Sequence, residues 1–368
     1  MLAYLDWNAT APLRPEAADA MAEALRRTGN PSSVHRWGRA ARQAIERARA
    51  QVADLVGAAP AEVIFTSGGT EANHLALGGV QGRRILISAI EHDSVRESVP
   101  DATVIPVTAA GVVDLAGLEV SLASDPRPAL VSIMFANNET GALQPIAQAT
   151  ALARRHGALF HCDAIQGAGK LPVDMRALGA DLLSISAHKL GGPQGVGALI
   201  VRDRVTLTAL QRGGGQERGR RAGTENGAGI AGFGAAAELA AREALSSAGT
   251  AELRDRAEAA LTAVAPDARV FAKEAPRLPN TLCIGLSGLA ASTQVMALDL
   301  AGVMVSAGAA CSSGKVRRSH VLSAMGATPE EAESAIRVSL GWSTTAAEIE
   351  KFLDAWAALY RRARSVAA

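Results

Sequence analysis

The sequence predicts an α/β protein with a large, doubly wound and mostly parallel sheet and a smaller α+β domain. Up to about residue 200 of the 368-residue chain, short β-branched apolar runs alternate with longer helical patterns. The runs are apolar on both faces, which is typical of strands covered by helices on two sides. Regular alternation of strands and helices favours parallel pairing.

The helices and strands of the large domain are predicted from local sequence patterns. Residues 34–56 are rich in Ala and Arg and are followed by Gly57, which predicts an amphipathic helix that ends at a glycine. The expected strands are residues 62–66, 84–88, 130–134, 158–162, 181–185 and 198–201.

The pattern changes after a long helical stretch at residues 228–264, which is nearly continuous in Ala, Leu and Glu. Strands near 281–284 and 336–340 then alternate with helices near 292–300 and 346–361, as in an α+β unit. We therefore expect residues 15–255 to form the large domain, and residues 1–14 and 256–368 to form the small one.

Composition excludes several classes of partner. A formal net charge of +1 provides no field that would recruit nucleic acid or an anionic membrane. The N-terminus has no signal-peptide pattern, and no apolar stretch approaches the length of a membrane span. Cys162, Cys283 and Cys311 are odd in number and widely spaced, so neither a disulfide framework nor a metal site is expected. These features indicate a cytoplasmic protein.

Polar residues follow five successive predicted strands. In open α/β sheets, ligands lie beyond the carboxyl ends of the strands. The loop after the first strand can offer backbone N–H groups to a phosphate, although an ordinary glycine turn is an equal alternative. The five segments are Thr66–Ala72, Glu91–His92, Asn137–Gly141, Asp163–Gln166 and Ser186–Gly192.

Asp163 and Lys189 together indicate pyridoxal-5′-phosphate (PLP) as the cofactor. A carboxylate keeps the pyridine nitrogen protonated, so that the ring can accept electrons. A lysine amine binds the cofactor as a Schiff base and later moves protons at the substrate Cα. Either residue alone could be a surface charge, but the combination at successive strand ends favours the cofactor site.

With these motifs in place, the chain resembles the cysteine desulfurases of the NifS/IscS type, in the class V aminotransferase group of fold-type I PLP-dependent transferases. The resemblance implies conversion of L-cysteine to L-alanine, with the sulfur passed to an acceptor protein such as an iron–sulfur cluster scaffold. The matching segments are residues 5–10, 30–35, 66–72, 91–92, 137–141, 163–166, 186–192, 213–217 and 221–226.

The resemblance also implies how the phosphate of the cofactor would be bound. Thr70, Ser186 and His188 would hold it, together with the backbone at Gly69. Thr224 would reach the phosphate of the neighbouring subunit, so the family pattern implies a homodimer.

The same resemblance implies roles around the cofactor ring. His92 would stack on the ring and serve in acid–base catalysis, and Asp163 would pair with the ring nitrogen. Asn138 and Gln166 would contact the ring hydroxyl, and Lys189 would carry the cofactor.

Cys311 is the candidate nucleophile. It lies in the segment 308–314, whose small, polar and Gly-flanked residues are typical of an exposed loop rather than a core. Cys162 and Cys283, by contrast, lie in apolar strand runs and are expected to be core residues. By resemblance, Cys311 attacks the sulfur of the bound substrate and takes it as a persulfide. It is also a candidate transient ligand of an iron–sulfur cluster, and no other metal site is expected.

Arg337 is the candidate for binding the substrate carboxylate. It interrupts an otherwise apolar strand pattern, and a guanidinium can hold a carboxylate with two parallel hydrogen bonds. The alternative is a charge on an edge strand. Position in the family pattern favours the substrate role, assisted by Asn8 and Asn138.

Three other functions remain open at the level of the sequence. A class V PLP aminotransferase would have no use for Cys311, and a selenocysteine lyase would not require it. A non-catalytic scaffold would not need both Lys189 and Asp163, and both are present.

Overall fold

A computed structural model describes residues 2–308 and 318–367. Within these residues, the large domain contains a seven-stranded sheet of order β2-β8-β7-β6-β5-β3-β4. Its strands are β2 (Val63–Thr66), β3 (Arg84–Ser88), β4 (Thr103–Ile105), β5 (Ala129–Met134), β6 (Leu159–Asp163), β7 (Leu182–Ser186) and β8 (Gly197–Val201).

Only β8 runs against its neighbours within this sheet, pairing antiparallel with both β2 and β7. The remaining described pairs are parallel. Since β2 and β7 are both antiparallel to β8, they run in the same direction, and the carboxyl ends of six strands meet at one edge. The prediction of a mostly parallel α/β sheet is confirmed.

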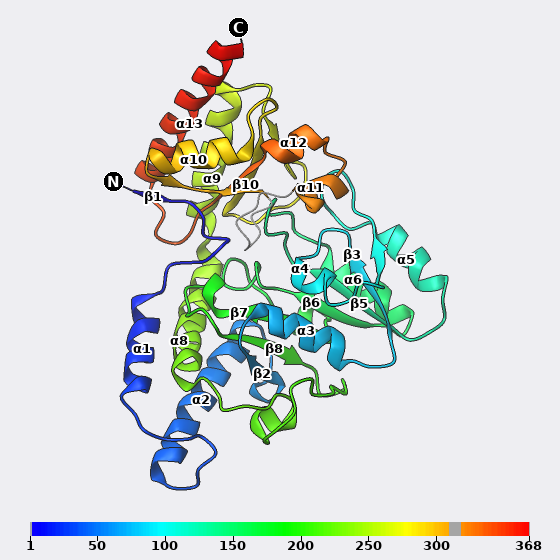
Figure 1. Cartoon of the computed structure of the whole chain (residues 1–368). Helices are drawn as coiled ribbons and strands as arrows, with labels where there is room; N and C mark the ends of the chain where they lie inside the picture. Colours follow the sequence, from blue (N-terminus) through cyan, green and yellow to red (C-terminus); the bar gives the residue numbers. More distant parts are fainter. Residues whose placement is uncertain (1, 309–317, 368) are drawn as a thin grey trace.

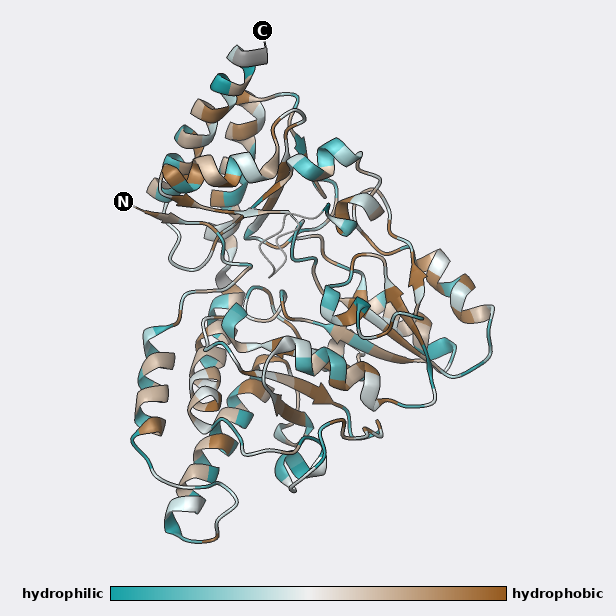
Figure 2. Ribbon diagram, in the orientation of Figure 1, coloured by the Kyte–Doolittle hydropathy of each residue, from teal (hydrophilic) through white to brown (hydrophobic). Residues whose placement is uncertain are grey.

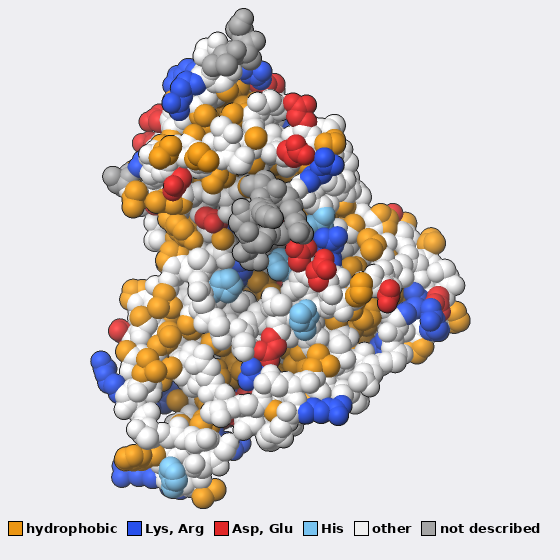
Figure 3. Space-filling view, viewed as in Figure 1, with side chains coloured by type: hydrophobic (Ala, Val, Ile, Leu, Met, Phe, Trp, Pro, Cys, Tyr) orange, Lys and Arg blue, Asp and Glu red, His pale blue; other side chains and the backbone are white. Residues whose placement is uncertain are grey.

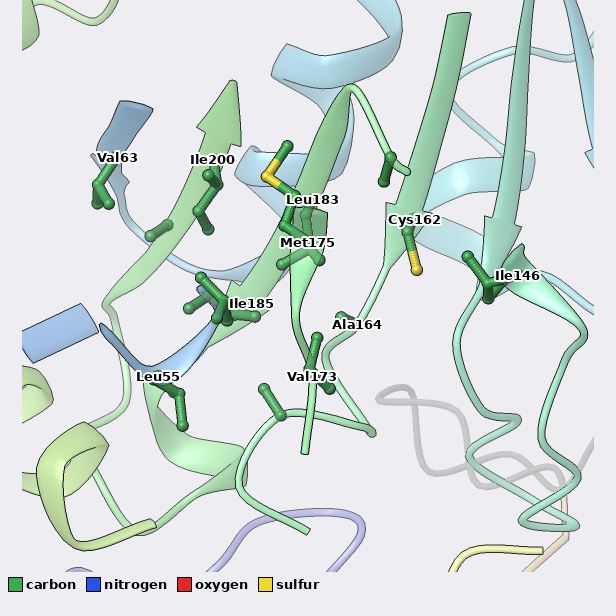
Figure 4. Packing of buried hydrophobic residues seen from close by; sticks show 14 of the residues in the cluster. Leu55, Val63, Ile146, Cys162, Ala164, Val173, Met175, Leu183, Ile185 and Ile200 are labelled. Atoms are coloured by element: carbon green, nitrogen blue, oxygen red, sulfur yellow. The ribbon is translucent and has the colours of Figure 1, made fainter. Parts of the chain in front are cut away.

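Helices cover both faces of this sheet (Figure 1). Apolar residues of α2, α6 and α8 form one core against alternate strand residues, and residues of α3 and α4 form a second core on the opposite face. Figure 2 shows the sheet strands as mainly hydrophobic, and Figure 4 shows Cys162, Ile185 and Leu183 within the first core. The helices are α1 (Pro15–Leu25), α2 (Arg36–Leu55), α3 (Gly69–Gly79), α4 (Asp93–Arg96), α5 (Leu115–Ala123), α6 (Ile146–Arg155), α7 (Met175–Leu178) and α8 (Gly227–Glu243).

The small domain has an antiparallel sheet of order β12-β13-β10-β9 in the described residues, and a separate parallel pair, β1 with β11. The strands are β1 (Ala3–Tyr4), β9 (Arg269–Val270), β10 (Thr281–Gly285), β11 (Val303–Met304), β12 (Ser306–Ala307) and β13 (Ile336–Ser339). The helices are α9 (Ala248–Val264), α10 (Ala291–Leu300), α11 (His320–Ala324), α12 (Pro329–Ser334) and α13 (Ala346–Ala367).

The chain crosses between the two domains twice. Near the N-terminus, Leu5 accepts a backbone hydrogen bond from Ser339 of the small domain, whereas Ala11 donates one to His188 of the large domain. Later in the chain, Ala241 in α8 packs against the core of the large domain, whereas Leu253 in α9 packs against the core of the small domain. The domain boundaries expected after residues 14 and 255 remain predictions.

The position of Arg337 corrects one alternative. Strand β13 lies between β12 and β10, and Arg337 is opposite Ser306 on one side and Cys283 on the other. Arg337 is also almost completely buried. It is therefore not a charge on an edge strand.

None of the described helices is long and apolar enough to cross a membrane.

Candidate active site

The predicted site residues that follow strands lie at the carboxyl edge of the large sheet, next to Asn8 and Arg337. Histidine side chains gather on this face of the molecule (Figure 3). Asp163 and Ser186 are the last residues of β6 and β7, and Gly69 begins α3 after the short loop that follows β2. Asn8 and Arg337 approach from the small-domain side, because the segment after β1 and strand β13 are joined at Asp6 and Ser339.

The loop between β2 and α3 is held close to the sheet. Gly69 is the first residue of α3 and is buried, and a Cβ added there would lie 2.3 Å from Ile165 Cδ1 and 3.4 Å from Ser186 Cβ. A Cβ on Gly197 in β8 would lie 2.6 Å from the carbonyl carbon of Gly68. The two glycines therefore allow a helix N-terminus to lie against the end of β7, an arrangement suited to binding an anion.

The remaining phosphate candidates differ in their surroundings. Thr70 is exposed at the start of α3, whereas Ser186 is buried at the end of β7. His188 is half-buried and its Nδ1 lies 3.2 Å from Thr10 Oγ1. Burial and the nearby charge of Lys189 lower the pKa of His188 to about 4, so it is neutral at pH 7. Thr224 is exposed, and within the described chain no hydrogen bond joins it to another candidate residue.

A hydrogen-bonded chain connects Asp163 to His92. Asn73 of α3 donates from Nδ2 to Asp163 Oδ2 at 2.7 Å and to Ser94 Oγ at 2.9 Å. The backbone N–H of Ser94 donates to His92 Nδ1 at 3.0 Å. Because Nδ1 accepts this bond, the proton of a neutral His92 is on Nε2. The carboxylate and the imidazole are thus fixed by one network.

Asp163 is a buried carboxyl group. Burial raises its pKa, and the hydrogen bonds from the Ile165 N–H and from Asn73 and the charge of Lys189 offset only part of this rise. Asn73 was not among the residues expected from the sequence. The signal that could have identified it is a polar residue on a helix face that otherwise carries Ala72, Leu75 and Ala76.

The amino group of Lys189 contacts the N-terminal segment. Its Nζ donates to the backbone oxygens of Asn8 and Ala9, each at 2.7 Å. Burial lowers the pKa of Lys189 to about 8, and the charge of Arg337 adds to this effect, while Asp6 and Asp163 oppose it. An amine with a pKa close to neutrality is suited to forming a Schiff base and to transferring protons.

Arg337 has one donor group to spare. Its Nη2 forms an ion pair with Asp6 Oδ1 at 2.8 Å, and its Nη1 donates to the backbone oxygen of Asn138 at 3.2 Å. Its Nε is buried without a hydrogen-bond partner. A buried guanidinium N–H of this kind is costly unless an additional acceptor binds to it. The same Asn138 oxygen accepts from Asn8 Nδ2 at 3.2 Å, so the three predicted substrate residues lie together.

Gln166 is buried, and its Nε2 donates to the backbone oxygen of Asn8 at 2.9 Å. Its Oε1 accepts a short hydrogen bond from Lys170. The sequence-based set of candidates did not include Lys170. A lysine directly after Gly167, Ala168 and Gly169, in a turn that follows the Asp163 strand, is the signal that could have identified it.

The two described cysteines lie in the interior. Cys162 and Cys283 are both buried and free, and burial raises the pKa of each thiol. They are therefore poor nucleophiles, and the prediction that they are core residues is confirmed. Cys311 lies outside the described residues.

The residues present fit PLP. The site contains a buried carboxyl, a lysine amine of lowered pKa, an imidazole of fixed orientation and a helix N-terminus kept close to the sheet by glycines. In that order, these groups would contact the ring nitrogen, the aldehyde carbon, the ring face and the phosphate of PLP. The orphaned Nε of Arg337 in addition suits a carboxylate beside the cofactor.

Comparisons with known proteins agree with this interpretation. A cysteine desulfurase of Cereibacter sphaeroides is 46% identical over 366 residues, covering 95% of this chain and 94% of the relative. A NifS-like protein of Rickettsia africae has a structure that matches with a TM-score of 0.92 at 38% identity, covering 98% of this chain and all of that one. A structure described as SspA in complex with cysteine matches with a TM-score of 0.79 at 30% identity, covering 92% and 98%. The family described as aminotransferase class-V matches residues 3–352, and the chain belongs to that family.

Proposed function

We propose that this protein is an L-cysteine desulfurase that uses PLP bound to Lys189. The observation that carries the proposal is that Lys189 and Asp163 follow neighbouring strands at one sheet edge, close enough to the charge of Arg337 for it to lower the pKa of Lys189, while Arg337 Nε is buried without a partner. PLP, when bound, supplies the aldehyde that captures the substrate amine and a ring that accepts electrons from it. Full-length similarity to proteins named cysteine desulfurase supports the choice of substrate.

The chain's own residues would bind the cofactor as follows. Asp163, oriented by Asn73, would keep the ring nitrogen protonated, and His92 would cover the ring face. Gln166 and Asn138 would donate to the ring hydroxyl. The residues proposed to hold the phosphate are Gly69, Thr70, Ser186 and His188, with Thr224 contributed by the partner subunit of a homodimer.

Arg337 would bind the α-carboxylate of L-cysteine, with Asn8 and Asn138 alongside. The Nε of Arg337 has no partner, and its Nη1 and Nη2 are already oriented by Asn138 and Asp6. Because the guanidinium is fixed before substrate binds, little side-chain entropy is lost on binding. Lys189 and His92 would then transfer protons at the substrate Cα and Cβ.

Cys311 would complete the reaction. Its thiolate attacks the substrate Sγ, so a new S–S bond forms while the substrate Cβ–Sγ bond breaks. The electron pair of the broken bond stays with the substrate carbon, which gains a proton and leaves as L-alanine. A thiolate of a sulfur-acceptor protein then attacks the outer sulfur of the Cys311 persulfide, the S–S bond to Cys311 breaks, and Cys311 leaves as the thiolate. The transferred sulfur would serve iron–sulfur cluster assembly or thio-modification, and we place the protein in the cytoplasm.

Replacing the proposed nucleophile tests this function. We expect Cys311→Ala to retain the yellow cofactor but to lose at least about 100-fold in sulfide release from L-cysteine in the presence of a thiol reductant, which frees sulfide from the persulfide, because no other described thiol is accessible. Cys283→Ala is the matched control and should retain most of the activity. Full sulfide release by Cys311→Ala would contradict the proposal, and conversion of L-cysteine to its 2-oxo acid with the C–S bond intact would favour an aminotransferase.

A further inference from the structure

Lys170 is a second lysine beside the proposed cofactor site. It lies four residues after Gln166, in the turn that follows β6, and its amino group is enclosed by polar groups of both domains. Burial and the charges of Lys189 and Arg337 lower the pKa of Lys170 well below its usual value. The proposed reaction assigns it no role.

The contacts of Lys170 are made with two side-chain amides. Its Nζ donates to Asn8 Oδ1 at 2.7 Å and to Gln166 Oε1. Two N–H groups of the amine are used by these two oxygens. Asn8 Oδ1 also accepts from Asn280 Nδ2 at 3.1 Å, so the oxygen side of the Asn8 amide is surrounded by donors.

These contacts determine which way the side-chain amides of Asn8 and Gln166 are turned, with each amide oxygen facing Lys170. With Gln166 Oε1 facing Lys170, the Nε2 group faces away and donates one N–H to the backbone oxygen of Asn8. A flipped amide would place Oε1 against the backbone oxygen of Asn8 and would lose that hydrogen bond, while its Nε2 would face an amine that already donates to Asn8 Oδ1. One N–H of Gln166 Nε2 then remains for another acceptor.

We propose that Lys170 is a positioning residue that fixes the amide of Gln166 so that its remaining N–H is presented to the ring hydroxyl oxygen of bound PLP. The proposal rests on the proposed function. Through Asn8 Oδ1, the same amine also orients the Asn8 amide, whose Nδ2 donates to Thr281 Oγ1 at 2.9 Å and to the Asn138 backbone. Lys170 thereby links cofactor and substrate residues of the two domains.

The experiment is a pH titration of the visible absorbance of the PLP-bound protein. A donor to the ring oxygen stabilises its negative charge and so favours loss of the proton shared with the cofactor-bound nitrogen of Lys189. We expect Lys170→Met and Gln166→Ala each to raise the titration midpoint by about one pH unit. Lys170→Arg, which keeps the donors, should stay closer to the unmodified protein.

The double variant separates positioning from charge. If Lys170 acts through Gln166, Lys170→Met introduced into the Gln166→Ala protein produces no further shift. A further shift of the same size would mean that Lys170 acts by its charge, and an unshifted Lys170→Met would mean that it does not position Gln166. Either result overturns the proposal.

Lys170→Gln is the variant to use if Lys170→Met does not fold. Its shorter amide can donate to one of the two oxygens, so an intermediate shift is expected, and an unchanged midpoint would contradict the proposal. Failure of the underlying function is distinguishable, because an unmodified protein that binds no PLP would show no visible band to titrate.

Discussion

At the residue scale, the central feature is a buried carboxyl group that must remain ionised. Burial alone raises the pKa of Asp163, since a charge is poorly solvated in the protein interior. The N–H groups of Asn73 and Ile165, each within 3.0 Å of a carboxylate oxygen, offset part of this rise, and the pKa of Asp163 remains raised. The ring nitrogen proposed to face Asp163 would add a further opposite charge.

We predict that Asn73→Ala weakens PLP binding by roughly 10-fold, the equivalent of about 1.4 kcal/mol for one hydrogen bond to a charged group. Loss of the donor raises the pKa of Asp163 and so reduces its interaction with the protonated ring. The dissociation constant of PLP is the measurement. His74→Ala, on the exposed side of the same helix, is the control, and equal affinities of the two variants would refute the role of Asn73.

Single residues could be predicted from the sequence where they follow strands, because the ends of parallel strands meet at one edge. Asp163, Ser186 and Gly69 were found in this way. Asn73 and Lys170 were not, because their partners are far away in the sequence or depend on how a turn folds. Asn73 meets Asp163 across 90 positions, and Lys170 meets Asn8 across 162.

At the scale of elements, β8 and the loop before α3 depend on each other. Strand β8 pairs antiparallel with β2 and brings Gly197 opposite Thr66, where the loop begins. The missing side chain at Gly197 lets the backbone of Gly68 approach the strand. The N-terminus of α3 is thereby held beside Ser186, as a phosphate-binding loop requires.

Gly197→Ala is expected to push this loop away from the sheet, because its Cβ would lie 2.6 Å from a backbone carbon that cannot rotate aside. Affinity for PLP should fall by about 10-fold or more, and affinity for pyridoxal, which has no phosphate, should change less. Titration with both compounds measures the difference. Gly249→Ala, in α9 with open space around it, is the control. Equal losses for PLP and pyridoxal would show that the loop does not act on the phosphate.

The longer elements were predicted well because their signals are local. The long apolar runs match β3, β5, β6, β7 and β8 within one or two residues at their ends. Strands β1, β4, β9, β11 and β12 have only two or three residues each and were missed. Such short segments have too few residues to show a period, and tertiary contacts decide their conformation. The antiparallel direction of β8 likewise has no local signature.

At the scale of the whole molecule, the site is assembled from both domains. The large domain supplies the residues proposed to bind the cofactor, and β13 of the small domain supplies Arg337. Asn8 joins them, since its backbone oxygen accepts from Lys189 and its side chain contacts Thr281 in β10. Substrate binding and cofactor binding are therefore expected to be coupled through the N-terminal segment.

In the proposed reaction, sulfur from L-cysteine passes through Cys311. The most direct measurement is mass spectrometry of peptides after brief incubation of the PLP-bound protein with L-cysteine and trapping of thiols. We expect one additional sulfur atom on the peptide that contains Cys311, and none on the peptides of buried Cys162 and Cys283. Alanine formed at the full rate with no sulfur ever bound to Cys311 would contradict it.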